Sequence, residues 1–308
     1  MIRFASTLCL LPLPAMAGVP TVMTDIVPLQ SLTAQVMGDL GAPAAALLPP
    51  GADPHDFSLR PSDAERLADA EIIFWVGESL TPWMKEQLQT LAPQAVQFSL
   101  LETTGWTPLE VRELEEFAVF QDGETIDADP HDDDGDIDPH AWLDPVIAGV
   151  WTQKIAAELA RIDPENAAVY RANADATVAR LAALTDDIAA QFDGLTDRAY
   201  VLPHDGYQYF EARFGLTALG AFSGIDARTP GPAQVAALRA ELAGSNVACV
   251  MSDAEIGDRW AQLITEGTSA NTTQIDGVGV GLVEGTALYE QMVRRLADNF
   301  AQCLGTGS

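Results

Sequence analysis

Positive charge is scarce in this sequence. Only 16 of its 308 residues are lysine or arginine, against 45 aspartates and glutamates, which gives a formal net charge of −29. Such a chain has no broad electrostatic attraction to nucleic acid or to an anionic membrane surface. We therefore expect no nucleic-acid partner and regard cations as the more natural ligands.

Long apolar runs are also missing. The apolar stretch within residues 1–17, MIRFASTLCLLPLPAMA, is shorter than the roughly 20 residues that span a bilayer. Its single arginine, apolar centre and final Ala-Met-Ala are typical of a secretory signal peptide. We predict cleavage after Ala17 and a soluble exported protein in the periplasm.

Cysteine is rare, with three residues in the whole chain. Removal of the signal peptide discards Cys9 and leaves Cys249 and Cys303. An even pair in an oxidising compartment favours a disulfide. The alternative is a pair of buried free thiols.

Strand and helix patterns alternate through most of the remaining chain. In the first half, residues 21–27 and 71–77 predict strands, and Ser62 and Glu65 have the spacing of a capping box at the start of a helix. Further strands are predicted at 199–202, 246–251 and 272–275, followed by an amphipathic helix at 287–304. This alternation predicts an α/β fold of two Rossmann-like lobes, each a parallel sheet with flanking helices.

A long helical pattern separates the two halves. Apolar residues recur every three or four positions across 163–193, after an Asp-Pro start, and a second Asp-Pro pair begins a helix at Pro145. We predict one long backbone helix at 163–193 that joins an N-terminal lobe, 18–162, to a C-terminal lobe, 194–308.

The segment 107–139 interrupts the alternation. Thirteen carboxylates lie between Glu110 and Asp138, against the single cation Arg112. Self-repulsion and few apolar anchors predict a mobile acidic loop. It is not an EF-hand, because Pro130 and Ala141 occupy positions that require oxygen ligands.

Histidine is also rare, with four residues in the chain. The four histidines each follow a proline, and they are His55, His131, His140 and His204. His204 follows a predicted strand, as does Asp276, and ligands of open α/β sheets collect at the carboxyl ends of strands. We expect His55, His140, His204 and Asp276 to meet in the cleft between the lobes.

Three imidazoles and a carboxylate form a suitable tetrahedral set for Zn²⁺. Imidazole-rich sites favour zinc over calcium or magnesium, and over manganese when compared with sites richer in carboxylate. His131 and the neighbouring Asp132, Asp133 and Asp134 are candidates for a weak accessory metal site in the acidic loop. The alternative for His131 is a solvated loop residue without a role.

Four ordered motifs carry a family resemblance. GADPHDFSLRPSD, DPHAWLDP, PHDGYQYF and IDGVG resemble, in order and spacing, the signature segments of periplasmic zinc-binding proteins of ABC transporters, the ZnuA-like branch of the metal-binding cluster with a rigid linking helix. The resemblance covers nearly the whole mature chain. It implies that His55, His140 and His204 are zinc ligands, that Asp276 supplies the carboxylate and that Cys249 pairs with Cys303.

The sequence departs from the family pattern at three places. The acidic loop holds a single histidine where zinc-type loops are often histidine-rich, and Pro54 occupies the position of a glutamate sometimes found before the first ligand. The segment around Asp276 reads Asp-Gly-Val-Gly in place of the frequent Asp-Pro-Leu-Gly. Manganese- and iron-type relatives commonly carry a glutamate at the position of His204, which favours zinc here.

The sequence therefore predicts a non-enzymatic solute-binding protein that carries Zn²⁺ to an ABC permease of the inner membrane. A periplasmic metal donor is a possible second partner, and we expect a monomer. The alternatives are a manganese-type member of the same family, a zinc hydrolase with Asp276 as general base, and a structural or adhesion metalloprotein. The sequence contains neither of the hydrolase motifs H-E-x-x-H and G-x-S-x-G.

Overall fold

The computed structural model describes most of the chain after the first 17 residues. The described ranges are 18–41, 43–112, 118–119, 137–223, 235–236, 239–240, 242, 246–254 and 258–305. His131 and Asp132 to Asp134 lie outside them, as does most of the acidic segment. No helix of the described ranges is both long and apolar enough to cross a bilayer.

The first lobe contains a parallel four-stranded sheet. Its strand order is β2 (Ala45–Ala46), β1 (Val22–Thr24), β3 (Ile72–Trp75) and β4 (Val96–Ser99). Three helices connect these strands, namely α1 (Val27–Met37), α2 (Pro61–Ala68) and α3 (Met84–Leu91). β1 and β3 are buried throughout, as expected for a sheet covered on both faces.

The second lobe contains a parallel five-stranded sheet. Its order is β5 (Ala118–Val119), β7 (Gly220–Ser223), β6 (Tyr200–His204), β8 (Cys249–Asp253) and β9 (Asn271–Ile275). The helices α6 (Gln208–Phe214) and α8 (Arg259–Thr265) belong to this lobe. β5 comes from the acidic segment, which precedes the long helix in sequence, and pairs with β7.

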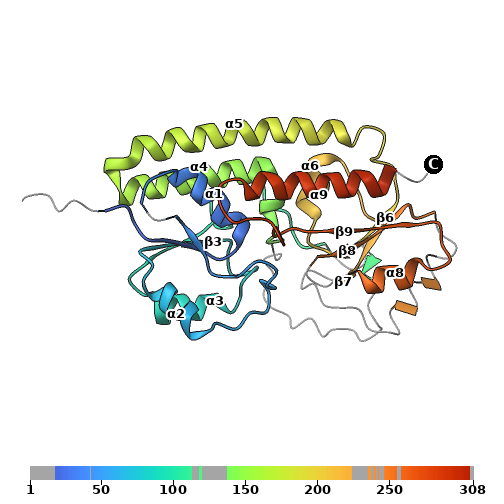
Figure 1. Cartoon of the computed structure of the whole chain (residues 1–308), viewed down its shortest axis with the longest axis horizontal. Coiled ribbons are helices and arrows are strands. Elements are labelled where there is room, and N and C mark those ends of the chain that lie inside the picture. The colour runs from blue at the N-terminus through green and yellow to red at the C-terminus, as the bar shows by residue number, and fades with distance from the viewer. Residues whose placement is uncertain are drawn as a thin grey trace, which may run out of the picture.

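Three helices form a layer along both lobes (Figure 1). They are α4 (Pro145–Ile162), α5 (Ala167–Gln191) and α9 (Leu288–Gly305). The 25 residues of α5 extend about 37 Å at 1.5 Å per residue, and a short 3₁₀ turn, Pro164–Asn166, precedes it. The predicted two-lobed α/β fold with a long joining helix is confirmed.

One core cluster connects the lobes through this layer. It contains buried side chains from both sheets and from the helices, such as Leu29, Trp151, Leu181, Met251 and Phe300. The disulfide between Cys249 on β8 and Cys303 on α9 fastens the second sheet to the same layer. The predicted pairing of these cysteines is confirmed.

Helix capping follows the prediction at one helix and differs at another. Asp144 caps α4, because its Oδ1 accepts a hydrogen bond from the Val146 N–H at 2.8 Å. The predicted Ser62–Glu65 box is wrong. Helix α2 begins two residues earlier, with Arg60 at the N-cap, and Asp63 binds back to the backbone N–H of Arg60 at 3.0 Å. Proline at the first helical position fixes this earlier start.

Candidate metal site

The predicted ligands lie at the ends of strands or in the loops beside them. His204 is the last residue of β6, and Asp276 directly follows β9. His140 precedes the 3₁₀ turn Ala141–Leu143, which leads into α4, and His55 lies in the connection between β2 and α2. The carboxyl ends of parallel strands therefore direct residues of the second lobe toward the first.

A small pocket of about 30 Å³ brings the three histidines together. It is lined by Asp53, Pro54, His55, His140, Trp142, Leu143, His204, Gly206, Tyr207, Asp253, Gly277 and Val278. The ring centroids of His55 and His140 are 5.4 Å apart, and those of His140 and His204 are 5.5 Å apart. The residues come from both lobes, so the pocket lies between them.

The Nε2 atoms of His204 and His140 both approach the backbone of Gly206. A Cβ atom at Gly206 would lie 2.2 Å from Nε2 of His204 and 3.0 Å from Nε2 of His140. Nε2 of His55 is buried without a hydrogen-bond partner. Within the described ranges, no three His, Cys, Asp or Glu side chains already form a complete metal-binding cluster. Coordination of an ion therefore requires side-chain adjustments around these nitrogens.

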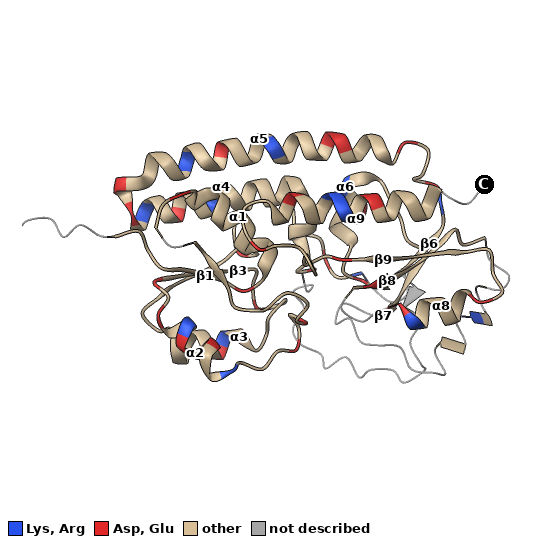
Figure 2. Cartoon of the chain, in the orientation of Figure 1, with Lys and Arg blue, Asp and Glu red and all other residues tan. Residues whose placement is uncertain are grey.

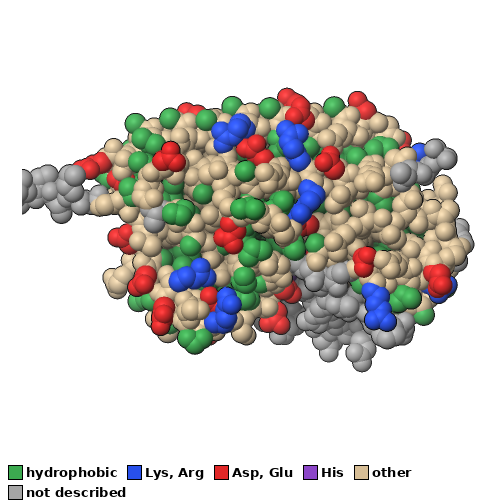
Figure 3. Space-filling view, viewed as in Figure 1, with side chains coloured by type: hydrophobic (Ala, Val, Ile, Leu, Met, Phe, Trp, Pro, Cys, Tyr) green, Lys and Arg blue, Asp and Glu red, His purple; other side chains and the backbone are tan. Residues whose placement is uncertain are grey.

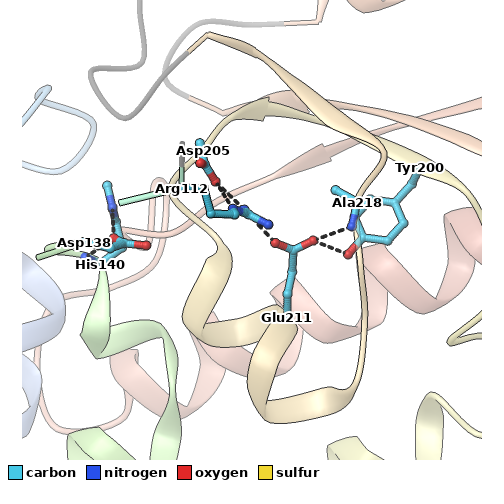
Figure 4. Close-up of polar contacts among 7 residues, drawn as sticks. All are labelled: Arg112, Asp138, His140, Tyr200, Asp205, Glu211 and Ala218. Atoms are coloured by element: carbon cyan, nitrogen blue, oxygen red, sulfur yellow. Dashed lines mark hydrogen bonds and ion pairs between the residues drawn. The ribbon is translucent and has the colours of Figure 1, made fainter. Parts of the chain in front are cut away.

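Asp138 fixes the orientation of His140. Its Oδ1 lies 2.9 Å from Nδ1 of His140 and accepts a 2.9 Å hydrogen bond from the His140 backbone N–H (Figure 4). Both residues are buried. A carboxylate on Nδ1 orients the ring and leaves Nε2 available to a metal.

His204 has a carboxylate neighbour on the same ring nitrogen. Oδ2 of Asp253 lies 3.5 Å from Nδ1 of His204 and accepts a 3.1 Å hydrogen bond from the Tyr207 hydroxyl. Tyr207 also packs against the His204 ring, with centroids 5.3 Å apart. These contacts confine His204 to the pocket wall.

The segment that carries His55 is held by two contacts. Oδ1 of Asp53 accepts a 2.9 Å hydrogen bond from the His55 backbone N–H, and Nε1 of Trp83 donates a 2.9 Å bond to the Pro54 carbonyl. Trp83 in turn packs on Phe57, with ring centroids 5.6 Å apart. Aromatic packing thus places the Pro-His pair at the pocket.

Two of the imidazoles are disposed to be neutral. Burial, together with the charge of His140, lowers the pKa of His55 from 6.5 to about 3. Burial also lowers the pKa of His204 well below its usual value, with smaller contributions from His140 and His55. Neutral imidazole is the form that binds a metal, so protons compete weakly at these two nitrogens.

Asp276 lies beside the pocket but does not line it. Its Oδ2 forms an ion pair with Arg295 of α9, while Oδ1 accepts hydrogen bonds from the backbone N–H groups of Val278 and Gly279 at 3.0 and 2.9 Å. The next two residues along the chain, Gly277 and Val278, do line the pocket. The carboxylate therefore belongs to a loop that reaches the pocket, but its own partners are Arg295 and the loop backbone.

A buried ion-pair network includes Asp205, the residue that follows His204. Arg112 contacts Asp205, and its Nη2 lies 2.8 Å from Oε2 of Glu211 (Figure 4). Oε1 of Glu211 accepts hydrogen bonds from the Tyr200 hydroxyl at 2.6 Å and from the Ala218 N–H at 2.7 Å. Burial raises the pKa of Asp205 and of Glu211, and the guanidinium opposes that rise.

Sequence reasoning did not identify several residues around the histidines. The residues missed are Asp138, Gly206, Tyr207, Asp253 and Arg295. Asp138 and Gly206 each lie two positions from a predicted ligand, and this proximity was the signal that could have found them. Asp253 and Arg295 are distant in sequence from every predicted ligand, so only the fold reveals them.

Charged residues are spread along the helix layer. Described acidic and basic residues occur at scattered positions on α4, α5 and α9 (Figure 2). No described histidine is visible on the face drawn in Figure 3, in keeping with the burial of His140 and His204.

Comparison with known proteins identifies the family to which this chain is similar. The family model for the zinc-uptake complex component A, periplasmic (ZnuA), matches residues 22–303. The high-affinity zinc uptake system protein ZnuA of Paracoccus denitrificans is 35% identical, over 95% of this chain and 94% of that protein. The corresponding protein of Brucella abortus is 32% identical, over 92% of this chain and 91% of that protein.

Solved structures share the fold. A crystal structure of ZnuA superposes with a TM-score of 0.76 at 22% identity, covering 94% of this chain and all of the other. The laminin-binding protein Lmb of Streptococcus agalactiae, described as a bifunctional protein with adhesin and metal transporting activity, has a TM-score of 0.73 at 24% identity, covering 92% of this chain and 99% of its own. With the family model matching nearly the whole chain and relatives above 30% identity over its length, this protein belongs to the ZnuA family of periplasmic zinc-uptake components.

Proposed function

We propose that this protein is the extracytoplasmic solute-binding component of an ABC zinc uptake system. It captures Zn²⁺ between its lobes with His55, His140 and His204, and Asp276 is the fourth donor. The observation that carries the proposal is the convergence of three histidine rings on one interlobe pocket, with centroid separations of 5.4 and 5.5 Å. Membership of the ZnuA family supports the same function.

The donor set explains the choice of metal. Three imidazole nitrogens and one carboxylate oxygen suit tetrahedral zinc, with bonds of roughly 2.0–2.2 Å. A manganese-type member would favour a further carboxylate in place of an imidazole. Occupation of all four positions by side chains leaves no site for an activated water, which argues against a zinc hydrolase with Asp276 as general base.

The ion acts as cargo that connects the lobes. His55 comes from the first sheet's side, and His204 and Asp276 come from strand ends of the second sheet. Zinc binding therefore cross-links the two lobes, and the shared helix layer limits the movement that accompanies it. We divide the mature chain into the lobes 18–162 and 194–308, joined by the helix 163–193.

The family and the N-terminal sequence support a cellular setting for this function. The protein acts in the periplasm after cleavage behind Ala17 and delivers zinc, as a monomer, to an inner-membrane ABC permease. A periplasmic metal donor is a second partner, and His131 with Asp132 to Asp134 forms a weak accessory site.

Isothermal titration with zinc tests the ligand assignment. His140→Ala and His204→Ala should each weaken zinc binding about a hundredfold or more, because each removes one of four donors. His131→Ala, by contrast, should leave the affinity of the main site unchanged and report on the accessory site. An affinity within a factor of two of the unmodified protein in both main-site variants would contradict the assignment.

Melting experiments provide an independent check. Zinc at a hundred times its dissociation constant should stabilise the folded protein by about 2.7 kcal/mol. A melting temperature that is indifferent to zinc would exclude specific capture by the folded state. Anomalous scattering at the zinc edge would then identify the ion and its ligands directly.

A further inference from the structure

The buried carboxylate of Asp276 already has a cation. Asp276 is 5% exposed, and its Oδ2 is paired with Arg295, whose side chain is 36% exposed. A buried carboxylate without a partner is strongly unfavourable, so an opposite charge must accompany it whenever zinc is absent. Arg295 supplies that charge in this structure.

The two oxygens of Asp276 are held in different ways. Oδ1 accepts the backbone N–H groups of Val278 and Gly279, which anchors it within its own turn. Oδ2 is held by a side chain that reaches across from α9. Oδ2 can therefore change partner without dismantling the turn that carries Gly277 and Val278 to the pocket.

Arg295 also has a second anchor close to the first. Its Nη2 donates a 2.8 Å hydrogen bond to the Val280 carbonyl, in the same loop as Asp276. If Oδ2 moves toward the histidines, this bond keeps the guanidinium near the loop. The arginine then remains available to recover the carboxylate when the metal leaves.

We propose that Arg295 and the zinc ion compete for Asp276, so that capture of zinc displaces the arginine from the carboxylate and release of zinc restores the pair. The inference rests on the proposed zinc site and adds a residue that tunes its affinity. Arg295 lowers the affinity by stabilising the metal-free form. It thereby favours release of the ion to the permease.

The decisive variant is Arg295→Gln, compared with Arg294→Gln. Arg294 is the neighbouring residue of α9, and its Nη2 pairs with Asp187 on the surface at 2.9 Å. Loss of a partly exposed ion pair that exists only in the metal-free form should tighten zinc binding about five- to tenfold. Arg294→Gln removes the same charge from the same helix and should leave the zinc affinity unchanged.

A double-mutant cycle separates displacement from simple repulsion between the arginine and the ion. Asp276→Asn alone should weaken zinc binding. The double variant Asp276→Asn with Arg295→Gln should bind zinc with the same affinity as Asp276→Asn alone. Persistence of the tightening in the Asp276→Asn background would overturn the competition. So would an affinity of Arg295→Gln within twofold of the unmodified protein.

Thermal melting distinguishes competition from a purely structural ion pair. Arg295→Gln should lower the melting temperature of the metal-free protein and leave that of the zinc-saturated protein unchanged. An equal decrease in both forms would mean that the pair persists with zinc bound, and would refute the proposal. His140→Ala, titrated in parallel, tests the underlying site: if it binds zinc normally, the proposed function fails and this inference falls with it.

Discussion

A methyl group at Gly206 should weaken zinc binding about a hundredfold or more while leaving the fold intact. Gly206 lines the pocket, and a Cβ at this position would lie 2.2 Å from Nε2 of His204 and 3.0 Å from Nε2 of His140. A zinc–nitrogen bond is roughly 2.0–2.1 Å long, so the methyl carbon of Gly206→Ala would take the space next to Nε2 of His204 in which a bound ion has to lie.

The magnitude follows from the donors that are lost. An ordinary contact requires about 3.5 Å, so the His204 ring must move away by more than an ångström. Structural zinc sites bind with about 10–16 kcal/mol, or roughly 3 kcal/mol for each of four donors. Displacement of one imidazole should therefore weaken binding about a hundredfold, and displacement of both still further.

Stability should change much less than affinity. The groups that would clash are the ends of histidine rings that face a pocket, so relaxation should limit the loss of unfolding free energy to about 1 kcal/mol. Gly149→Ala is the matched control: it lies within α4, and its Cβ would meet Val178 and Leu181 at ordinary distances of 3.7 and 4.0 Å. That variant should bind zinc normally.

Competition titration against a chromophoric chelator, with urea unfolding of the metal-free proteins, measures both quantities. If Gly206→Ala binds zinc within threefold of the unmodified protein and remains folded, the Nε2 atoms of His140 and His204 are not the donors. The reasoning from pocket geometry would then be wrong.

Three further outcomes are expected. Asp138→Asn should weaken zinc binding about 10- to 100-fold in titrations, because it removes the carboxylate that orients Nδ1 of His140 at 2.9 Å; full affinity would show that the ring is oriented by other contacts. Since the pKa of His55 falls from 6.5 to about 3 on folding, the unfolded chain takes up that proton first, and the unfolding free energy of the metal-free protein should decrease as pH falls below 6.5, by at most about 1.4 kcal/mol per pH unit. His55→Gln should reduce this slope in urea unfolding series between pH 7 and 5, and an unchanged slope would count against the shift. Replacement of Cys249 and Cys303 by serine should lower the unfolding free energy by roughly 4 kcal/mol, because the disulfide spans 54 residues, without altering the zinc stoichiometry.

Local sequence patterns were sufficient to predict the fold class. Alternating strand and helix signals predict parallel sheets. A helix between two strands returns the chain to the end of the sheet where the first strand began, so the two strands run parallel. The Asp-Pro pair at 144–145 predicted the start of α4 because a capping side chain and a first-turn proline act within a few residues. Interactions between residues this close in the chain can be recognised from a single sequence.

The same reasoning failed where two local signals competed. Ser62 and Glu65 had the spacing of a capping box, but Pro61 begins the helix two residues earlier than that box requires and makes Asp63 the third residue. The pairing of β5 with β7 could not be predicted either, because strand partners depend on long-range packing. The two residues of β5 contain no sequence pattern that identifies β7 as the neighbouring strand.

The candidate site divides in a similar way. Strand ends and Pro-His pairs predicted which histidines would approach one another, and the structure brings His55, His140 and His204 to one pocket. The direction of the Asp276 carboxylate was not predictable, because it depends on Arg295, which lies 19 residues later on another element. Residue types can nominate donors, but the orientation of each donor depends on its neighbours in three dimensions.

The shared core has a consequence for how the ion enters and leaves. Buried residues of both sheets and of α1, α4, α5 and α9 belong to a single cluster, so wide separation of the lobes would expose much of that apolar surface. Closely packed interiors do not deform continuously, and the least costly motions are rotations of side chains at the pocket. If the three histidines and Asp276 are the donors, as proposed, capture in such a frame relies on exchange of partners by these individual groups. The proposed exchange between Asp276–Arg295 and Asp276–zinc would then let a rigid protein bind a doubly charged ion tightly and still release it.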